Sequence, residues 1–367
     1  MPIDSVSPTR PRWLRLNVRL RMRTLLVLVL ALGGGLGWVV HRARVQRDAV
    51  AAIRRVGGGV AFDWQRASVR PGSAPPTAPG PDWLRRALGP DFLDTATYVR
   101  LNGEPCQDES LRAACRLPWL EELIVLNTGA TDAGAEDLRR LKNLRTLDLR
   151  LNRMTPRPLR HIGDMTELRE LKLAMRLSPV PLRDEDLAFL SRLTKLERLM
   201  IPSKDLTDAW LPYIERLRNL ESLELYDMAI TTKGLDHLQG LSNLRVLSLH
   251  GSRITGLEPL RPLAKLSSLC VAYTPVGDSA LACARDWPLL YRLDLRKTNI
   301  TDAGLIDLAE LPALRELDLS QTGVTDAGLR HLAGSKSLRS VIARGTAITD
   351  TGIEEFSKVN PTVAVTR

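Results

Sequence analysis

Most of the sequence consists of one unit that recurs about every 24 residues. Residues 298–311 read TNITDAGLIDLAEL, and residues 322–335 read TGVTDAGLRHLAGS. Full units begin at residues 118, 142, 166, 194, 218, 242, 264, 288, 312 and 336, after a degenerate unit at 94. Two units depart from the common length, with 28 residues at 166–193 and 22 residues at 242–263. A unit this short cannot bury its apolar side chains alone, so the repetition predicts a stacked solenoid.

Each unit has two halves with different apolar periods. The pattern LxxLxL, as in Leu314, Leu317 and Leu319, ends in two leucines separated by one residue and predicts a short strand. The pattern DAGLxxLxxL, residues 302–311, spaces its leucines three apart and predicts a short helix, for which Thr301 is a suitable N-cap. We therefore expect an α/β solenoid with a parallel sheet on its concave side and helices on its convex side.

The N-terminus is basic, and the rest of the chain is electrostatically balanced. The net charge is +10, and residues 1–55 contribute +9 of it through eleven Arg against two Asp. The balanced remainder lacks the basic surface that a phosphate backbone requires, so we expect no nucleic-acid partner.

An uncharged apolar run, TLLVLVLALGGGLGWVV, occupies residues 24–40. Its length is close to the minimum of about 17 residues for a membrane-spanning helix, and Trp38 suits a membrane interface. We interpret the run as an uncleaved, single-pass transmembrane anchor. A cleaved signal peptide is the alternative, because the run is only slightly longer than the apolar region of such a peptide.

Positive charge around the apolar run predicts its orientation. Six arginines precede the run and fewer follow it directly, which favours a cytoplasmic N-terminus and repeats outside the cytoplasmic membrane. Residues 1–23 then form a basic cytoplasmic tail. Residues 41–93 hold a juxtamembrane helix, a Pro-rich spacer at 71–81 and a capping segment at 81–89, and residues 94–367 form the repeat domain.

The segment LRELDLSQTGVTDAGLRHL, residues 314–332, resembles a leucine-rich repeat of the variant with a TDAGL-type convex helix. The resemblance covers residues 94–367 and implies a horseshoe-shaped leucine-rich repeat solenoid. With the apolar run and the Pro-rich stretch, the chain is similar to bacterial membrane-anchored leucine-rich repeat proteins of mostly unknown function. The same repeat variant occurs in receptor subunits of ubiquitin ligases, but here a membrane segment stands in place of their helical adaptor-binding module.

The sequence carries no recognisable catalytic motif. It lacks a Walker loop, HExxH, GxSxG and a CxxC pair, and its five histidines are scattered. We therefore expect neither an enzyme nor a small-molecule substrate, and no catalytic residue, cofactor or metal.

Four cysteines leave one alternative open. Cys106 takes the place of Ile in the ITD segment, so we expect it in the core, and Cys115 follows in the same terminal unit. A disulfide between them would suit an exported capping unit, and two buried free thiols are the alternative. Cys270 on a strand and Cys283 on a convex helix point to opposite faces and should not bridge.

The concave sheet is the surface that the repeats leave for binding. One exposed row lies between the last two strand leucines of each unit: Arg100, Ile124, Asp148, Lys172, Met200, Glu224, Ser248, Cys270, Asp294, Asp318 and Ile342. The row mixes both signs of charge, and about twelve strands spaced about 4.8 Å apart make a strip on the order of 55 Å long. Such a surface suits a protein or peptide partner.

Three consecutive units depart from the pattern. Seven units place Thr, Ser or Asn three residues past the last strand leucine, whereas the other three place Arg176, Lys204 and Met228 there. The same stretch contains the four-residue insertion, within RLSPVPLRD at 176–184. We predict a partner-binding patch formed by Lys172, Met200, Pro202, Glu224, Tyr226 and His250. Decay of the repeat without functional consequence is the alternative.

Taken as a set, these features predict a membrane-anchored protein–protein interaction module. The alternatives are a substrate-receptor-like subunit of a ubiquitin-ligase-type complex and a purely structural protein of the cell envelope.

Overall fold

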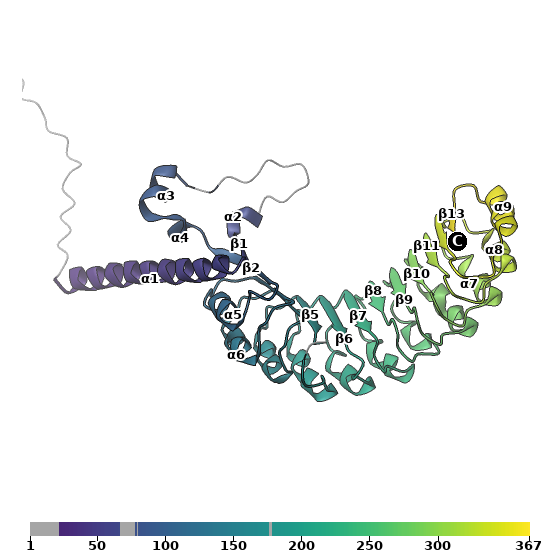
Figure 1. Ribbon diagram of the computed structural model, residues 1–367, viewed down its shortest axis with the longest axis horizontal. Helices are drawn as coiled ribbons and strands as arrows, with labels where there is room; N and C mark the ends of the chain where they lie inside the picture. The colour runs from purple at the N-terminus through teal and green to yellow at the C-terminus, as the bar shows by residue number, and fades with distance from the viewer. Residues whose placement is uncertain (1–21, 67–77, 79, 176–177) are drawn as a thin grey trace, which may run out of the picture.

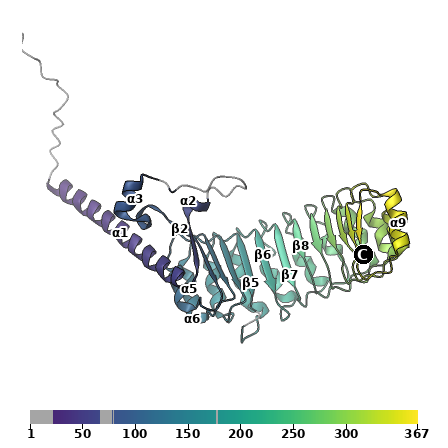
Figure 2. The ribbon, with the colours of Figure 1, turned by 45° about the horizontal axis from the view of Figure 1, so that its top comes forward.

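The strands of this computed structural model form one sheet in which they follow each other in chain order. The structure describes residues 22–66, 78, 80–175 and 178–367. The sheet bends into an arc, with strands on the concave side and helices on the convex side (Figure 1). The turned view shows the strands side by side along the inner surface (Figure 2). This architecture confirms the expected α/β solenoid.

The thirteen strands comprise one antiparallel strand at the N-terminal edge and a parallel series that continues to the C-terminus. They are β1 (Gly59–Phe62), β2 (Ala96–Asn102), β3 (Glu122–Leu126), β4 (Thr146–Arg150), β5 (Glu170–Ala174), β6 (Arg198–Pro202), β7 (Ser222–Tyr226), β8 (Val246–Ser248), β9 (Ser268–Cys270), β10 (Arg292–Asp294), β11 (Glu316–Asp318), β12 (Ser340–Ile342) and β13 (Ala364–Thr366). The last half unit of the sequence therefore completes the sheet.

The convex segments are short helices, and most of them are 3₁₀ helices. They are α5 (Asp108–Cys115), α6 (Asp132–Ala135), η1 (Glu136–Arg140), η2 (Arg157–Asp164), η3 (Asp184–Arg192), η4 (Asp208–Tyr213), η5 (Lys233–Leu238), η6 (Glu258–Leu260), η7 (Asp278–Asp286), η8 (Asp302–Gly304), α7 (Leu305–Leu308), α8 (Asp326–Leu332) and α9 (Asp350–Val359). A 3₁₀ helix has three residues per turn, so leucines spaced three apart share one face. The leucine spacing therefore fits the 3₁₀ geometry.

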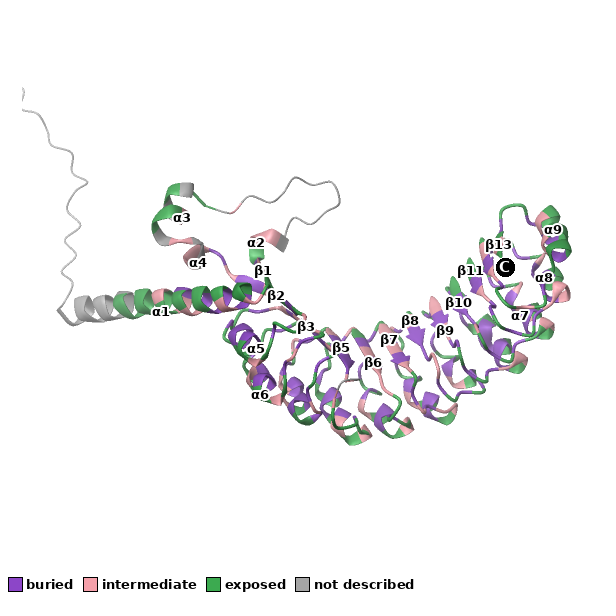
Figure 3. Ribbon diagram, viewed as in Figure 1, coloured by how far each residue is buried: buried purple, intermediate pink, exposed green. Residues whose placement is uncertain are grey.

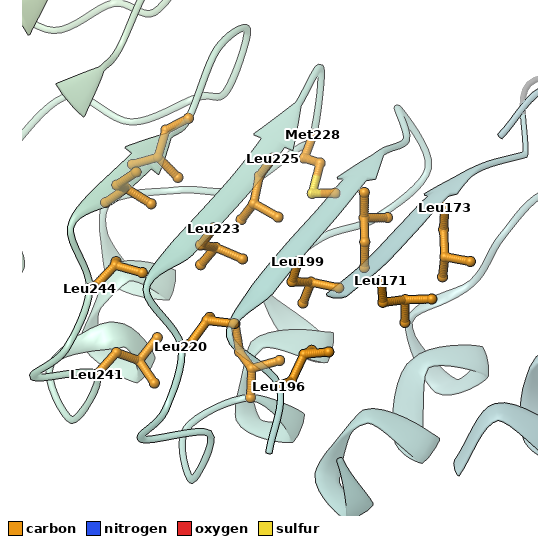
Figure 4. Packing of buried hydrophobic residues seen from close by; sticks show 14 of the residues in the cluster. Leu171, Leu173, Leu196, Leu199, Leu220, Leu223, Leu225, Met228, Leu241 and Leu244 are labelled. Atoms are coloured by element: carbon orange, nitrogen blue, oxygen red, sulfur yellow. The ribbon is translucent and has the colours of Figure 1, made fainter. Parts of the chain in front are cut away.

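A continuous layer of leucines fills the space between the sheet and the convex helices. Figure 4 shows strand residues such as Leu199 and Leu223 beside Leu196 and Leu220, which precede the strands. All four are buried, and the buried part of the ribbon runs along the whole arc (Figure 3). Neighbouring units thus share one core, as the repetition predicts.

Helices α1 (Met22–Arg55), α2 (Asp63–Arg66), α3 (Asp82–Leu88) and α4 (Pro90–Leu93) precede the repeats. The second half of α1 covers the open end of the first unit, where Ala49, Val50 and Ile53 join the common core. Strand β1 pairs with β2 at the same end. The N-terminal cap of the solenoid is therefore made by α1 and β1, and the exposed core that a terminal repeat would otherwise present is covered.

Polar contacts fix α1 against the first parallel strand. The buried Gln46 side chain donates to the Asp94 carbonyl at 2.8 Å and accepts from the Ala96 N–H at 3.0 Å. The Arg42 guanidinium donates to the Thr95 hydroxyl at 2.7 Å. Because the Gln46 amide uses both its donor and its acceptor, the helix is held at one position along the strand.

Strand β1 joins the N-terminal region to the solenoid. Because β1 pairs with β2, α1 and β1 contact the first unit directly, and not through the Pro-rich stretch. Most of the expected spacer at 71–81 lies outside the described residues. The segment at 81–89 does form helix α3, but the capping contacts come from α1 and β1.

The first half of α1 projects away from the solenoid (Figures 1 and 2). Of the expected cytoplasmic tail, residues 1–21 lie outside the described part of the structure, as do the side chains of residues 22–32. Residues 33–39 are exposed. Within the residues that the structure describes, no helix has both the length and the apolar character needed to cross a bilayer.

A series of hydrogen bonds, here called the Asp–Thr ladder, joins neighbouring units where the convex helices begin. In each step an Asp carboxylate accepts from both the backbone N–H and the hydroxyl of a Thr 23 residues later, at 2.7 Å each for Asp302 and Thr325. The steps are Asp108–Thr131, Asp132–Thr155, Asp184–Thr207, Asp208–Thr231, Asp278–Thr301, Asp302–Thr325 and Asp326–Thr349. The hydrogen bonds from Thr349 lower the pKa of Asp326.

The ladder lacks an Asp–Thr step at three junctions: beside each of the two units of unusual length, and between Thr232 and Thr255, where a Thr hydroxyl takes the place of the carboxylate. Pro156 stands in the Asp position, and Arg183 in the following Thr position belongs to the 28-residue unit. Gly256, in the 22-residue unit, stands in the Asp position, and Gly277, in the next unit, stands in the Thr position. Because each step needs a separation of 23 residues, the step that spans an insertion or deletion is lost, although Asp184 of the 28-residue unit still accepts from Thr207 in the next unit.

The ladder also explains the glycine of the TDAG motif. A Cβ on Gly328 would lie 2.5 Å from Oδ1 of Asp302 in the preceding unit. The same close approach occurs at Gly134, Gly234, Gly304 and Gly352. The glycine of the motif is therefore required by a contact between units, whereas the Thr and Asp mark the start of the helix.

We expect Gly328→Ala to destabilise the protein by roughly 1–3 kcal/mol, because the added methyl must displace the Asp302 carboxylate or the Val324 side chain. Gly334→Ala is the matched control in the same unit, since a Cβ there meets no atom within 4 Å. The measurement is urea-induced unfolding of both variants. Equal stability of the two would contradict the role assigned to the glycine.

Candidate functional site

The strand register aligns the residues that lie between the strand leucines into a row along the concave face, but the row expected to be exposed is mostly half-buried, and Asp148, Ser248 and Asp294 are buried. Lys172 lies opposite Met200, Met200 opposite Glu224, and Glu224 opposite Ser248. A second row lies two residues further along each strand, with Pro202 opposite Tyr226. The face therefore has the row order that the sequence predicts.

Many charged side chains of this face are paired within the protein. Arg150 contacts Asp148 at 2.7 Å on the same strand. Arg296 contacts Asp294 at 2.8 Å and Asp318 of the next strand at 3.4 Å. These pairs neutralise one another, so they give the two flanks of the face little net charge to attract a charged partner.

Between these flanks, aromatic rings line adjacent strand ends. The rings of Tyr226 and His250 have centroids 6.0 Å apart, and those of His250 and Tyr273 are 4.8 Å apart. Both pairs are tilted, as aromatic pairs commonly are. The Lys297 ammonium lies 5.0 Å from the centroid of the Tyr273 ring. We call Tyr226, His250 and Tyr273 the aromatic row.

Carboxylates lie beside the first two rings of the row, and the one beside Tyr226 accepts a hydrogen bond from it. The Tyr226 hydroxyl donates to Glu224 at 2.5 Å, and burial followed by this hydrogen bond raises the pKa of Tyr226. Nδ1 of His250 lies 3.5 Å from the Asp227 carboxylate. Tyr226 therefore stays a neutral hydrogen-bond donor throughout the physiological range.

A cavity of about 510 Å³ adjoins the row on the side of the insertion. Its walls combine the inserted segment with the next two units, and the residues that line it include Val180, Pro181, Leu182, Pro202, Lys204 and Asp227. The insertion thus builds a partly apolar recess next to the aromatic row.

The structure brings the predicted patch residues onto one face, but not all into contact. Pro202 lies directly opposite Tyr226 and also lines the cavity. Met200 lies opposite Glu224 and not beside Tyr226, because it belongs to the other row. Lys172 is engaged with Glu170 at 2.7 Å.

Sequence reasoning missed Tyr273. It has a φ of 60°, and the same left-handed position is held by Asn127, Leu151, Asp227, Lys297, Gln321 and glycines in other units. Left-handed backbone is unfavourable for a bulky side chain. An aromatic residue where most other units have glycine or a polar residue is the signal that would have pointed to it.

The polar side chains three residues past the last strand leucine satisfy backbone groups of the turn. The hydroxyls of Ser252, Thr274, Thr298 and Thr322 each donate at 2.6 Å to the carbonyl three residues earlier. Among the exceptions, Met228 is buried, Lys204 lines the cavity and Arg176 lies outside the described residues.

All four cysteines are free thiols in the structure, so Cys106 and Cys115 do not form the disulfide that was one alternative. Cys106 and Cys115 are buried, as is Cys283, while Cys270 is partly exposed. Burial is the main cause that raises the pKa of Cys115 to about 12 and that of Cys283 to about 12. Among the described residues, no group of three or more His, Cys, Asp or Glu side chains is arranged to hold a metal ion.

Comparisons with known proteins agree with this geometry. A family model described as a leucine-rich repeat matches residues 289–309 and 311–333. Among solved structures, an internalin (inlF) from Listeria monocytogenes has a TM-score of 0.53 and 18% identity, over 78% of this chain and 93% of that chain. The chain is a leucine-rich repeat protein.

Two further structures show weaker similarity. A leucine-rich repeat protein from Leptospira interrogans has a TM-score of 0.46 and 17% identity, over 70% of this chain and 80% of that chain. A plant peptide hormone receptor, RGFR1, in complex with RGF2, has a TM-score of 0.48 and 17% identity, over 73% of this chain and 47% of that chain. No curated protein matches the sequence.

Thiol labelling tests the state of the cysteines. We expect a maleimide at mildly alkaline pH to label the native protein mainly at Cys270, because burial blocks the other thiols and a pKa of about 12 leaves Cys115 and Cys283 protonated. Denaturation without reductant should expose all four thiols. If Cys106 and Cys115 formed a disulfide, only two would be labelled.

Proposed function

We propose that this protein is a membrane-anchored interaction module that binds a protein or peptide partner on its concave face. The aromatic row carries the proposal. The Tyr226 ring is held by its hydrogen bond to Glu224, and Tyr273 is 46% exposed in a backbone conformation that tyrosine seldom adopts. Strained residues gather at functional sites, and exposed aromatic side chains are frequent anchors of binding energy.

The surroundings of the row fit an extended polypeptide segment. The three rings lie at the ends of successive strands, which are spaced about 4.8 Å apart. They offer stacking and apolar contact to a polypeptide segment that crosses the strands. The adjoining cavity, with Val180 and Pro202 in its walls, can accept one apolar or prolyl side chain of the partner. Lys204 and Asp227 at the same cavity offer one charge of each sign.

The anchor is the second part of the proposal. It is supported by the uncharged run at 24–40 and by its flanking arginines. Helix α1 continues from this run without interruption onto the solenoid. We place the protein in the cell membrane with a cytoplasmic N-terminus and the repeats on the other side.

The alternatives have less support. A ubiquitin-ligase-type receptor role rests on the repeat variant alone, which is an analogy between folds. A purely structural envelope role does not account for Tyr273. An enzyme activity would need a catalytic cluster, and the described residues of the concave face offer paired charges and aromatic rings instead.

Site-specific photo-cross-linking can identify the partner in native cells. A photoreactive amino acid at Tyr273 should give a discrete adduct, whereas the same group at Tyr291 should not. Tyr291 is a matched control because it is 43% exposed but does not belong to the aromatic row.

With the partner in hand, Tyr273→Ala should weaken binding by about tenfold or more, which corresponds to about 1.4 kcal/mol. Tyr291→Ala should leave the affinity unchanged. Equal affinities of the two folded variants, measured by calorimetry, would refute the site and favour drift of the repeats.

Membrane fractionation tests the anchor separately. We expect the full chain to stay in the membrane pellet after alkaline extraction. Leu28→Arg combined with Leu32→Arg should release it, because each charge near the centre of a spanning helix costs about 3 kcal/mol. Protease added to intact spheroplasts should digest the repeats, and complete protection of the repeats would contradict the orientation.

A further inference from the structure

Exposed tryptophans gather at one end of the solenoid. Trp210 and Trp287, in the body of the repeats, are fully buried. Trp38, Trp83 and Trp119 are 57%, 68% and 44% exposed, and they belong to α1, to α3 and to the loop before β3. All three elements lie at the N-terminal end, from which α1 projects (Figures 1 and 2).

The Trp119 indole, in the first full repeat unit, lies close to Arg42 at the end of the apolar run. The Arg42 guanidinium lies 5.8 Å from the centroid of the Trp38 ring and 5.7 Å from that of the Trp119 ring. Trp38 belongs to the run at 24–40, and Arg42 follows the run directly. A residue of the solenoid is therefore held where a spanning helix would leave the hydrocarbon layer.

A cavity of about 340 Å³ opens between α1 and this edge of the solenoid. Its apolar walls include Val45, Leu117 and Pro118, and its cationic side chains are Arg42 and Arg116. No Asp or Glu is among the described residues that line it. Apolar walls and arginines, without a carboxylate, fit a phosphate ester that carries hydrocarbon.

We propose that this end of the solenoid rests on the bilayer surface, with the Trp119 indole in the headgroup region and an anionic phospholipid headgroup in the cavity. The inference rests on the proposed anchor at 24–40 and extends the contact with lipid to the repeat domain itself. Tryptophan favours the interface because its ring is apolar while its N–H can reach water or a headgroup. Arg42 and Arg116 supply the charge that complements an anionic leaflet.

The repeat pattern provides a matched pair of variants. Trp119 lies between Pro118 and Leu120, and Leu289, which is 50% exposed, lies between Pro288 and Leu290. The two residues hold the same position in units that begin at 118 and 288, and their strands are separated by seven steps, roughly 34 Å. Trp119→Leu and Leu289→Trp each place a residue that the repeat already accepts at that position.

The test uses full-length protein reconstituted into vesicles of phosphatidylcholine and phosphatidylglycerol. Some vesicles carry lipids brominated near the headgroup end of the acyl chain, which quench nearby indoles. We expect Trp119→Leu to lower the quenchable part of the tryptophan emission and Leu289→Trp to add emission that the bromolipid does not quench. The Trp119→Leu loss should be larger when phosphatidylglycerol carries the bromine. Circular dichroism verifies that both variants are folded.

Flotation of the vesicles separates the two hypotheses. If the protein floats but Trp119→Leu leaves the quenched emission unchanged, the lipid contact of the solenoid is wrong and the anchor stands. If Trp119 is shielded from bromolipid and its substitution abolishes a cross-linked dimer, a second copy of the chain covers this end and the proposal is overturned. If the protein does not float, the anchor fails and the contact fails with it.

Discussion

The hydrogen bonds from each Thr to the Asp one unit earlier set the spacing on which the rest of the solenoid depends. The leucine core provides most of the driving force for stacking, but apolar burial has no direction and does not by itself fix one register. On the concave side, strand pairing fixes the register; on the convex side, the Asp–Thr ladder does so. The glycine of TDAG exists because Asp302 and its counterparts occupy the space that a side chain would need.

The regular part of this fold can be predicted from sequence because its determinants are local and repeated. The alternation of leucines predicts the strands, and Tyr226 and His250 of the predicted patch do lie side by side. The role of the Pro-rich stretch is not predictable in this way, since composition indicates its stiffness but not that β1 returns to pair with β2. Tyr273 was missed because its left-handed backbone brings it into the row from a turn position.

The candidate binding site lies where the regular interactions of the repeat weaken. The insertion at the first interruption of the ladder forms the cavity beside the aromatic row, and the row ends just past the 22-residue unit. On one side of the row Arg150 forms an ion pair with Asp148, and on the other side Arg296 forms one with Asp294. The flanks are thus committed to internal contacts, while the middle of the arc presents rings and a recess to solvent.

The fixed separation of 23 residues between ladder partners also constrains how such a gene can change. Duplication or loss of a whole unit preserves every Asp–Thr step, because each new Asp meets a Thr at the right distance. A shorter insertion or deletion breaks a step unless it falls where none exists. Two of the junctions without an Asp–Thr step adjoin the units of unusual length, one on each side of Tyr226. The lineage is therefore free to vary the length of the segments that frame the aromatic row, while units joined by Asp–Thr steps change only in copy number.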